Sequence, residues 1–183
     1  GATAALTAAE TLTFTAAGKD VEVDIEANLT ATEAATAINS SESEVRAEAI
    51  AKVDITLGTA ASGTLSIGDH EIALDGDNNG TLLTKLTDFG YTASINGSVL
   101  QLDASGVDGI TTQKSNDAAA ANSVLINSRG DTTNTASAAA NTAFSFTSEL
   151  EFSSEKTFTV ASSDTTTSTI TAGLTATASE KTV

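Results

Sequence analysis

The sequence predicts an α+β fold that is mostly β, built from small modules of antiparallel β-hairpins, each covered by a short helix. Short runs of alternating apolar and polar residues recur on both sides of turn dipeptides, as they do in hairpins. Between these runs lie segments whose apolar residues repeat with helical spacing. Large apolar residues are scarce, with no Pro, Met or Trp and only 4% aromatic residues, so the predicted cores are thin.

Residues 63–105 carry the pattern most completely, starting with a hairpin. Two alternating runs, Leu65-Ser66-Ile67 and Glu71-Ile72-Ala73-Leu74, flank Gly68-Asp69, a pair that suits a tight turn. Because side chains alternate along a strand, the apolar members of both runs are expected on one face. These members are Leu65, Ile67, Ile72 and Leu74.

A short helix and a second hairpin are predicted next. The spacing of Leu82, Leu83, Leu86 and Phe89 gives one apolar stripe, and Gly90 can end that helix. Asn96-Gly97 then favours a two-residue type I′ loop. That loop pairs Ala93 with Leu100 and Tyr91 with Leu102, on a face that the helix can cover.

The first fifty residues repeat the same order. Alternating runs at 12–14 and 21–25 flank Ala17-Gly18, which predicts a hairpin. Thr30 and Glu33 have the spacing of a capping box, in which each side chain satisfies a free backbone N–H. The helix that follows carries an apolar stripe at Ala31, Ala34, Ala35 and Ile38. The two opening hairpins lie about fifty residues apart, which predicts an internal repeat.

The later part of the chain has weaker patterns. Leu150-Glu151-Phe152 and Phe158-Thr159-Val160 flank Ser154-Glu155-Lys156, which predicts a third, partial copy of the opening hairpin. Asp117 is expected to cap a helix running through residues 118–121 toward Val124-Leu125-Ile126. Ser128-Arg129-Gly130-Asp131 is typical of a turn or linker.

These segments predict a nested domain layout. Residues 1–55 together with 142–183 form a frame subdomain, residues 56–130 form a subdomain nested within it, and residues 131–141 form a linker. A linear string of three modules is the alternative.

The order hairpin, helix, hairpin resembles the flagellin hook IN motif of flagellins and hook-associated proteins. The matching residues are Leu65-Ser66-Ile67-Gly68, Ile72-Ala73-Leu74, Tyr91-Thr92-Ala93-Ser94 and Gly97-Ser98-Val99-Leu100-Gln101-Leu102. The Ile-Asn pair that names the motif is replaced here by Leu86-Thr87, but it is present in the first copy as Ile38-Asn39. There, residues 45–49 take the place of Tyr91-Thr92-Ala93-Ser94. The resemblance implies the outer, hypervariable region of such a protein.

Composition excludes several kinds of partner. The chain has 8 Lys and Arg against 24 Asp and Glu, and its net charge of −16 repels nucleic acids and anionic membrane surfaces. With no Cys, it has neither disulfides nor thiolate metal sites. No apolar run is long enough to span a bilayer, and no signal peptide is visible. Because the chain begins at Gly1 and lacks Met, we expect an excised or processed fragment.

The sequence offers little catalytic material. The single histidine, His70, flanks the Gly68-Asp69 turn, and no Gly-x-Ser-x-Gly nucleophile signature occurs. The acidic residues of the strands alternate with apolar ones, as on solvated hairpin faces. A paired-carboxylate glycosidase would need a sugar-stacking cleft, which a thin, aromatic-poor core does not supply. We therefore expect no enzyme, no catalytic, cofactor-binding or metal-binding residues, and no cofactor.

Three short motifs are expected to have structural rather than binding roles. Asp75, Asp77, Asn79 and Gly80 match the start of an EF-hand loop, but Leu83 and Leu86 stand at two later ligand positions, so no strong calcium site is predicted. Asn79 or Thr81 is expected to cap the following helix instead. Arg129-Gly130-Asp131 matches an integrin-adhesion tripeptide, yet a Gly-centred turn explains it. The N-glycosylation pattern occurs at Asn28, Asn39, Asn79 and Asn96, as chance predicts in a chain rich in Asn, Ser and Thr.

Two classes of function fit these features. By resemblance, the chain is a structural, surface-exposed outer domain of a bacterial flagellar filament protein, extracellular and part of the motility filament. Its partners are then other copies of the same protein, contacted through regions outside this chain, while the chain alone is monomeric because of its charge. The alternative is a binding module of a bacterial surface adhesin or S-layer-type protein. Long heptad-patterned helices in the flanking gene sequence favour the former, and a signal peptide with tandem β repeats favours the latter.

Overall fold

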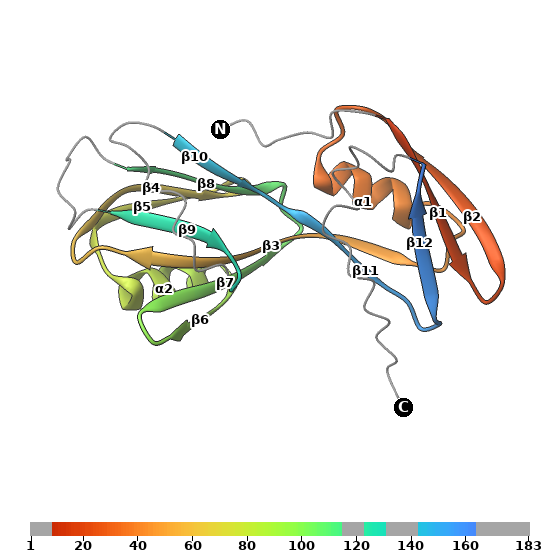
Figure 1. Cartoon of the computed structure of the whole chain (residues 1–183). Helices are drawn as coiled ribbons and strands as arrows, with labels where there is room; N and C mark the ends of the chain where they lie inside the picture. Colours follow the sequence, from red (N-terminus) through yellow and green to blue (C-terminus); the bar gives the residue numbers. More distant parts are fainter. Residues whose placement is uncertain (1–8, 115–122, 131–142, 164–183) are drawn as a thin grey trace. The chain divides into compact units, whose positions relative to one another are not determined.

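The computed structural model describes residues 9–114, 123–130 and 143–163, and in them the protein is mostly β, with antiparallel pairing and two short helices (Figure 1). In chain order the elements are β1 (Glu10–Ala16), β2 (Lys19–Ile25), α1 (Ala31–Asn39), β3 (Arg46–Leu57), β4 (Ala61–Ile67), β5 (His70–Asp77), α2 (Asn79–Asp88), β6 (Thr92–Asn96), β7 (Val99–Ser105), β8 (Gly109–Lys114), β9 (Val124–Ser128), β10 (Ala143–Thr147), β11 (Glu149–Ser153) and β12 (Phe158–Ser162).

The chain divides into two units. The central unit contains Ile50–Ser148, and the flanking unit contains Ala4–Ala49 together with Glu149–Val183. The sequence predicted a nested subdomain of residues 56–130, a linker of residues 131–141, and a frame that resumes at residue 142, so its boundaries with the frame lie at 55/56 and 141/142. The first of these positions falls inside β3, a single strand of 12 residues. β10, which follows the second, pairs with β8 of the central unit along its whole length.

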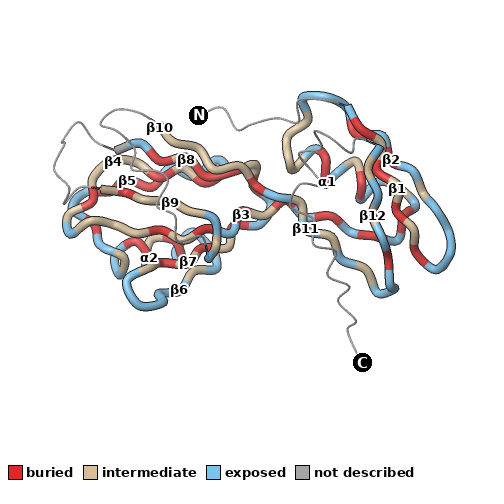
Figure 2. Tube along the Cα trace, in the orientation of Figure 1, coloured by how far each residue is buried: buried red, intermediate tan, exposed pale blue. Residues whose placement is uncertain are grey.

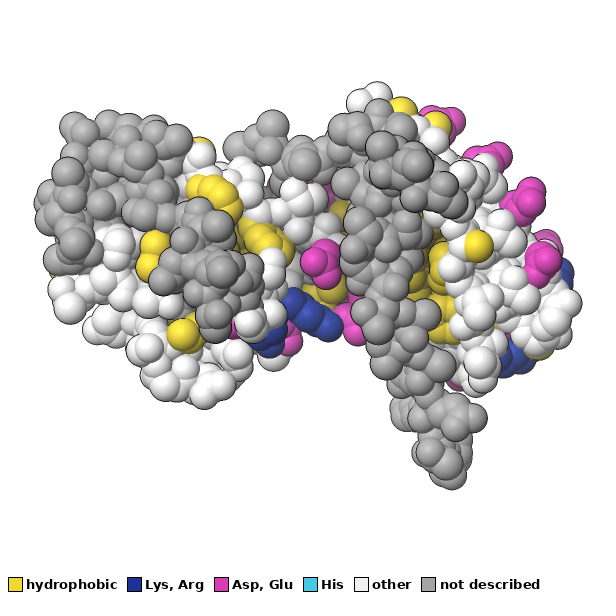
Figure 3. Space-filling model, in the orientation of Figure 1, with side chains coloured by type: hydrophobic (Ala, Val, Ile, Leu, Met, Phe, Trp, Pro, Cys, Tyr) yellow, Lys and Arg dark blue, Asp and Glu magenta, His cyan; other side chains and the backbone are white. Residues whose placement is uncertain are grey.

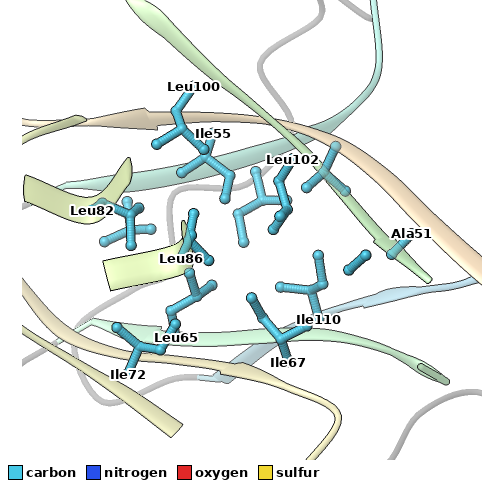
Figure 4. Packing of buried hydrophobic residues seen from close by; sticks show 14 of the residues in the cluster. Ala51, Ile55, Leu65, Ile67, Ile72, Leu82, Leu86, Leu100, Leu102 and Ile110 are labelled. Atoms are coloured by element: carbon cyan, nitrogen blue, oxygen red, sulfur yellow. The ribbon is translucent and has the colours of Figure 1, made fainter. Parts of the chain in front are cut away.

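The central unit is built on the predicted hairpin of β4 and β5. Ile67 pairs with His70, which leaves Gly68 and Asp69 as a two-residue loop. As expected from the alternation, the apolar residues of both strands share one buried face, with Leu65 and Ile67 fully buried. Figure 4 shows this face meeting Leu82 and Leu86 of α2 together with residues of β3, β7 and β8. α2 contacts β5, β6 and β7, and its stripe is narrower than predicted, because Phe89 lies beyond its end and is 46% exposed.

The second hairpin turns one residue later than predicted. Asn96 pairs with Val99, so the loop is Gly97-Ser98 rather than Asn96-Gly97, and Ala93 lies opposite Leu102 instead of Leu100. Gly97 has a φ of 62°, and a glycine at the first loop position suits a type II′ turn, whereas type I′ needs positive φ at both loop residues. The shift moves each pair by two positions, so the predicted residues keep their common face, but Tyr91 lies outside the strand.

The flanking unit follows the predicted order at its start. β1 and β2 pair through the loop Ala17-Gly18, whose φ angles of 51° and 76° are those of a type I′ turn. Thr30 and Glu33 form the predicted capping box of α1. Along β1, buried residues alternate with half-buried ones (Figure 2), and the core contains Leu12, Phe14, Ala34, Ala35 and Ile38.

The predicted third hairpin is wrong. β11 pairs with β3, whereas β12 pairs with β1, so Leu150-Glu151-Phe152 and Phe158-Thr159-Val160 belong to different sheets. Each strand gains a partner far away in the sequence: Ala16 of β1 lies opposite Phe158, which is buried in the flanking core. The apolar alternation identified the strands but not their partners.

The two units share one order of pairing. In the flanking unit, hairpin β1–β2 is followed by α1 and β3, and then β11 pairs with β3 while β12 pairs with β1. In the central unit, hairpin β4–β5 is followed by α2 and β6, and then β7 pairs with β6 while β8 pairs with β4. The two predicted copies therefore contain five strands and one helix each. The central unit also contains β9, β10 and the part of β3 from Ile50 onward, which pairs with β7 and β9.

Some weaker predictions changed or lie outside the description. Val124-Leu125-Ile126, expected at the end of a helix, forms the start of β9 and pairs with β3. Asp117 and residues 118–121 lie outside the described residues, as do residues 131–141.

Candidate functional site

His70 lies in a cluster of polar and aromatic side chains at the surface of the central unit. Its ring centroid is 4.9 Å from that of Phe89 and 5.7 Å from that of Tyr91. Its Nδ1 is 2.7 Å from the Tyr91 hydroxyl, which donates a hydrogen bond of 3.0 Å to the Ile67 carbonyl. The turn at Gly68-Asp69 positions His70, while Gly90 ends α2 and brings Phe89 and Tyr91 to it.

The hydrogen bonds of this cluster fix the proton positions. A carbonyl oxygen only accepts, so the single hydroxyl proton of Tyr91 goes to Ile67, and Nδ1 of His70 must donate to the hydroxyl. Burial raises the pKa of Tyr91, and the nearby charge of Asp69 raises it further, so the hydroxyl stays protonated. His70 thus acts as a donor that holds Tyr91 in place, rather than as a base that activates a nucleophile.

In the segment that resembles an EF-hand loop, residues 75–80, the Asp77 carboxylate forms an ion pair with the Lys85 side chain. Lys85 of α2 places its ammonium 2.7 Å from Oδ2 of Asp77 and donates to the Ala73 carbonyl. Burial of Asp77 opposes its charged form, but hydrogen bonds from Lys85, the Asp75 amide and Thr81 outweigh that effect and lower the pKa of Asp77. One of the two carboxylates that would begin a calcium site, that of Asp77, is therefore already paired with a cation.

The loop also differs from the prediction in its capping residue. Asn78, rather than Asn79 or Thr81, caps α2, since its Oδ1 accepts from the amides of Gly80 and Thr81. Leu86, at a position where an EF-hand places a bidentate Glu, is fully buried. In the described part of the chain, no three His, Asp or Glu side chains form a group that could hold a metal ion.

Arg129 is occupied by contacts within the central unit. Its guanidinium lies 3.0 Å from Asp54 and 2.6 Å from Asp103, and it also donates to the Leu102 carbonyl. The contact of Nε with Asp54 is an ion pair whose angle falls short of a hydrogen bond. The Gly130 amide donates to the other oxygen of Asp54, so this turn is fixed against β3 and β7. Asp131 lies outside the described residues.

Two of the four asparagines with the glycosylation pattern are held by hydrogen bonds. Asn39 accepts from the Ala47 amide and donates to the Ala47 carbonyl, each at 2.8 Å. Asn79 accepts from the Leu57 amide and donates to the Ser98 carbonyl. Asn28 follows β2 with a φ of 68°, and Asn96 lies at the exposed end of β6.

The acidic residues of β2 point away from the core, as the alternation predicted. Asp20 accepts from the Thr15 hydroxyl and Asp24 from the Thr11 hydroxyl, which are cross-strand neighbours on β1. Figure 3 shows acidic side chains dispersed over the flanking unit rather than gathered in one patch. They form a charged, solvated sheet face rather than a convergent carboxylate pair.

Comparison with family models and with curated proteins gives no relative from which a role could be transferred. No family model matches the chain, and no curated protein shows significant similarity to it. Neither α1 nor α2, the helices of the described residues, has the length and apolar character required to cross a membrane.

Proposed function

We propose that this chain is a structural outer domain of a bacterial flagellar filament protein, exposed on the outside of the filament. The observation that carries the proposal is the pairing order shared by the two units, a hairpin, a helix and three further strands. The residues that resemble the flagellin hook IN motif occupy corresponding elements of the two units. Ile38-Asn39 lies in α1 and Leu86-Thr87 in α2, while residues 46–49 lie in β3 and Thr92-Ala93-Ser94 in β6.

The proposed architecture is one helix-covered hairpin module nested in another. In the central unit, β6 continues into β7 through a two-residue loop, whereas in the flanking unit residues 50–148, which form the central unit, separate the first part of β3 from β11. An insertion between the third and fourth strands of one module accounts for the difference, because β6 and β7 are consecutive whereas β3 and β11 are far apart in the sequence. Ile38 of α1 and Leu86 of α2 take the same place in this scheme, and both are fully buried.

The surface chemistry supports the role of an exposed structural domain rather than that of a catalytic one. The candidate catalytic group, His70, is bound to Tyr91, and the candidate calcium ligand Asp77 is bound to Lys85. Among the described residues, Phe89 and Ile95 are the exposed large apolar side chains. A net charge of −16 opposes close packing of like surfaces, so assembly falls to regions of the parent protein outside this chain. The protein acts outside the cell, with copies of the same protein as its partners.

Immunogold electron microscopy tests the proposal. Antibodies raised against this chain should label flagellar filaments of the source bacterium along their length. Antibodies preadsorbed with the chain provide the control and should leave the filaments unlabelled. Labelling confined to the cell wall would refute the flagellar proposal and support the adhesin or S-layer class.

Analytical ultracentrifugation tests separately whether this chain assembles without the other regions of the parent protein. The isolated chain should sediment as a monomer near neutral pH, because its like charges are not compensated. Filaments formed by this chain alone would contradict the assignment of assembly to other regions.

A further inference from the structure

We propose that Asn96 is a site of spontaneous deamidation, while the second Asn-Gly pair of the chain, Asn79-Gly80, is protected by the fold. The inference rests on the geometry of the central unit and is independent of the proposed function. Both pairs have the same local sequence chemistry, because glycine leaves the following amide unhindered. A difference between them therefore comes from structure.

The reaction needs a particular approach of two groups. The backbone nitrogen of Gly97 attacks Cγ of Asn96, the Cγ–Nδ2 bond breaks, and ammonia leaves with the electron pair of that bond and the proton lost by the Gly97 nitrogen. A five-membered succinimide results. Water then opens the ring at Cγ to give aspartate, or at the main-chain carbonyl to give isoaspartate.

Asn96 is placed where this approach is least hindered. It is the last residue of β6, at the end of the β11-β3-β7-β6 strand order, and its pair with Val99 is the final one before the loop. The Gly97 amide lies beyond that pair, in the loop. Asn96, Gly97 and Ser98 are all exposed, and the space beside the Cα of Gly97 is open. Opening a terminal pair of this kind requires little free energy.

Asn79, in contrast to Asn96, is held by hydrogen bonds that hinder this attack. Its Nδ2 donates to the Ser98 carbonyl at 2.7 Å, and its Oδ1 accepts from the Leu57 amide at 3.3 Å. The nitrogen that would attack, that of Gly80, donates to Oδ1 of Asn78 at 2.9 Å. Attack at Asn79 therefore requires loss of the helix cap and of both side-chain hydrogen bonds, in the first turn of α2.

The modification would alter the surface of the central unit. It converts a neutral residue to a carboxylate on a strand with no charged side chain, since β6 reads Thr-Ala-Ser-Ile-Asn. Isoaspartate also adds one methylene to the main chain immediately before the loop. The Ser98 carbonyl of that loop is the acceptor for Asn79, so the change reaches the beginning of α2.

Peptide mapping by mass spectrometry, with isoaspartyl methyltransferase labelling, measures both sites in the folded chain incubated in mildly alkaline buffer. Conversion at Asn96 should be at least about ten-fold faster than at Asn79, a ratio that corresponds to about 1.4 kcal/mol. In denaturant the two rates should converge. Equal rates in the folded chain, no conversion at Asn96, or a ratio that persists in denaturant would each overturn the proposal.

A variant tests the protective contacts directly. Asn78→Ala removes the acceptor of the Gly80 amide, so conversion at Asn79 should rise several-fold while conversion at Asn96 stays the same. Hydrogen exchange of α2 in the same variant shows whether the helix still forms. A variant that keeps α2 folded and leaves the rate at Asn79 unchanged would refute the role of the Asn78 contact.

Discussion

Replacing Asn39 by Ala should destabilise the flanking unit by about 0.5–3 kcal/mol. The Asn39 side chain makes two hydrogen bonds of 2.8 Å with the backbone of Ala47, a residue buried in the flanking core. Each such bond contributes about 0.5–1.5 kcal/mol net, so about 1–3 kcal/mol is lost. The better helix propensity of Ala returns at most about 0.7 kcal/mol, and less at Asn39, because it is the last residue of α1.

Thr87→Ala is the matched control, because Thr87 takes the place of Asn39 in the second copy. Its hydroxyl donates to the carbonyls of Leu83 and Thr84 in its own helix, so its removal should change stability by less than about 0.5 kcal/mol. Urea unfolding followed by circular dichroism measures both variants, and hydrogen exchange of peptides from each unit locates the effect. Equal losses for the two variants, or loss of protection at β4–β5 rather than β1–β2 in Asn39→Ala, would refute the reasoning.

Three further predictions concern the central unit. Leu86→Ala should cost about 2–5 kcal/mol in urea unfolding, because Leu86 is fully buried among the residues of Figure 4; Thr84→Ala, on the exposed side of α2, should cost less than about 0.5 kcal/mol. The pKa of Asp77 is lowered, so the stability from its carboxylate is complete above its unfolded pKa of about 3.9 and is lost as the pH falls through the folded value. Asp77→Asn should remove that part of the acid transition seen by circular dichroism, and an unchanged transition would contradict this assignment. Calorimetry should detect no micromolar calcium binding, since Lys85 already neutralises Asp77; such binding, lost in Asp75→Ala, would contradict it.

Local features could be predicted from the sequence because a few adjacent residues determine them. Gly68-Asp69 and Ala17-Gly18 form the expected two-residue loops, and Thr30 forms the expected capping box with Glu33. Each depends on backbone angles or hydrogen bonds within about four residues. The position of His70 beside the first of these turns was predicted for the same reason. Its contacts with Phe89 and Tyr91 were not, because they depend on where the chain leaves α2.

Features that depend on packing between distant segments could not be predicted. At the second hairpin, both Asn96-Gly97 and Gly97-Ser98 are acceptable two-residue loops, and both keep the same residues on the buried face. In the observed register Tyr91 is outside the strand, and its hydroxyl donates to the Ile67 carbonyl. Strand β8 likewise could not be predicted from its sequence, because Ile110 is its only large apolar residue. Only its pairing with β4 and β10 identifies it as a strand.

The interrupted module explains why the third hairpin was mispredicted. β11 and β12 have the alternation of a hairpin and lie close in sequence, so local rules favour pairing them with each other. In the central unit, the corresponding strands β7 and β8 are also consecutive and also pair with different partners, β6 and β4. Within the proposed module, consecutive fourth and fifth strands therefore pair with the third and first strands. Applied to the flanking unit, this order assigns β11 to β3 and β12 to β1, even though residues 58–148 lie between β3 and β11 in the sequence.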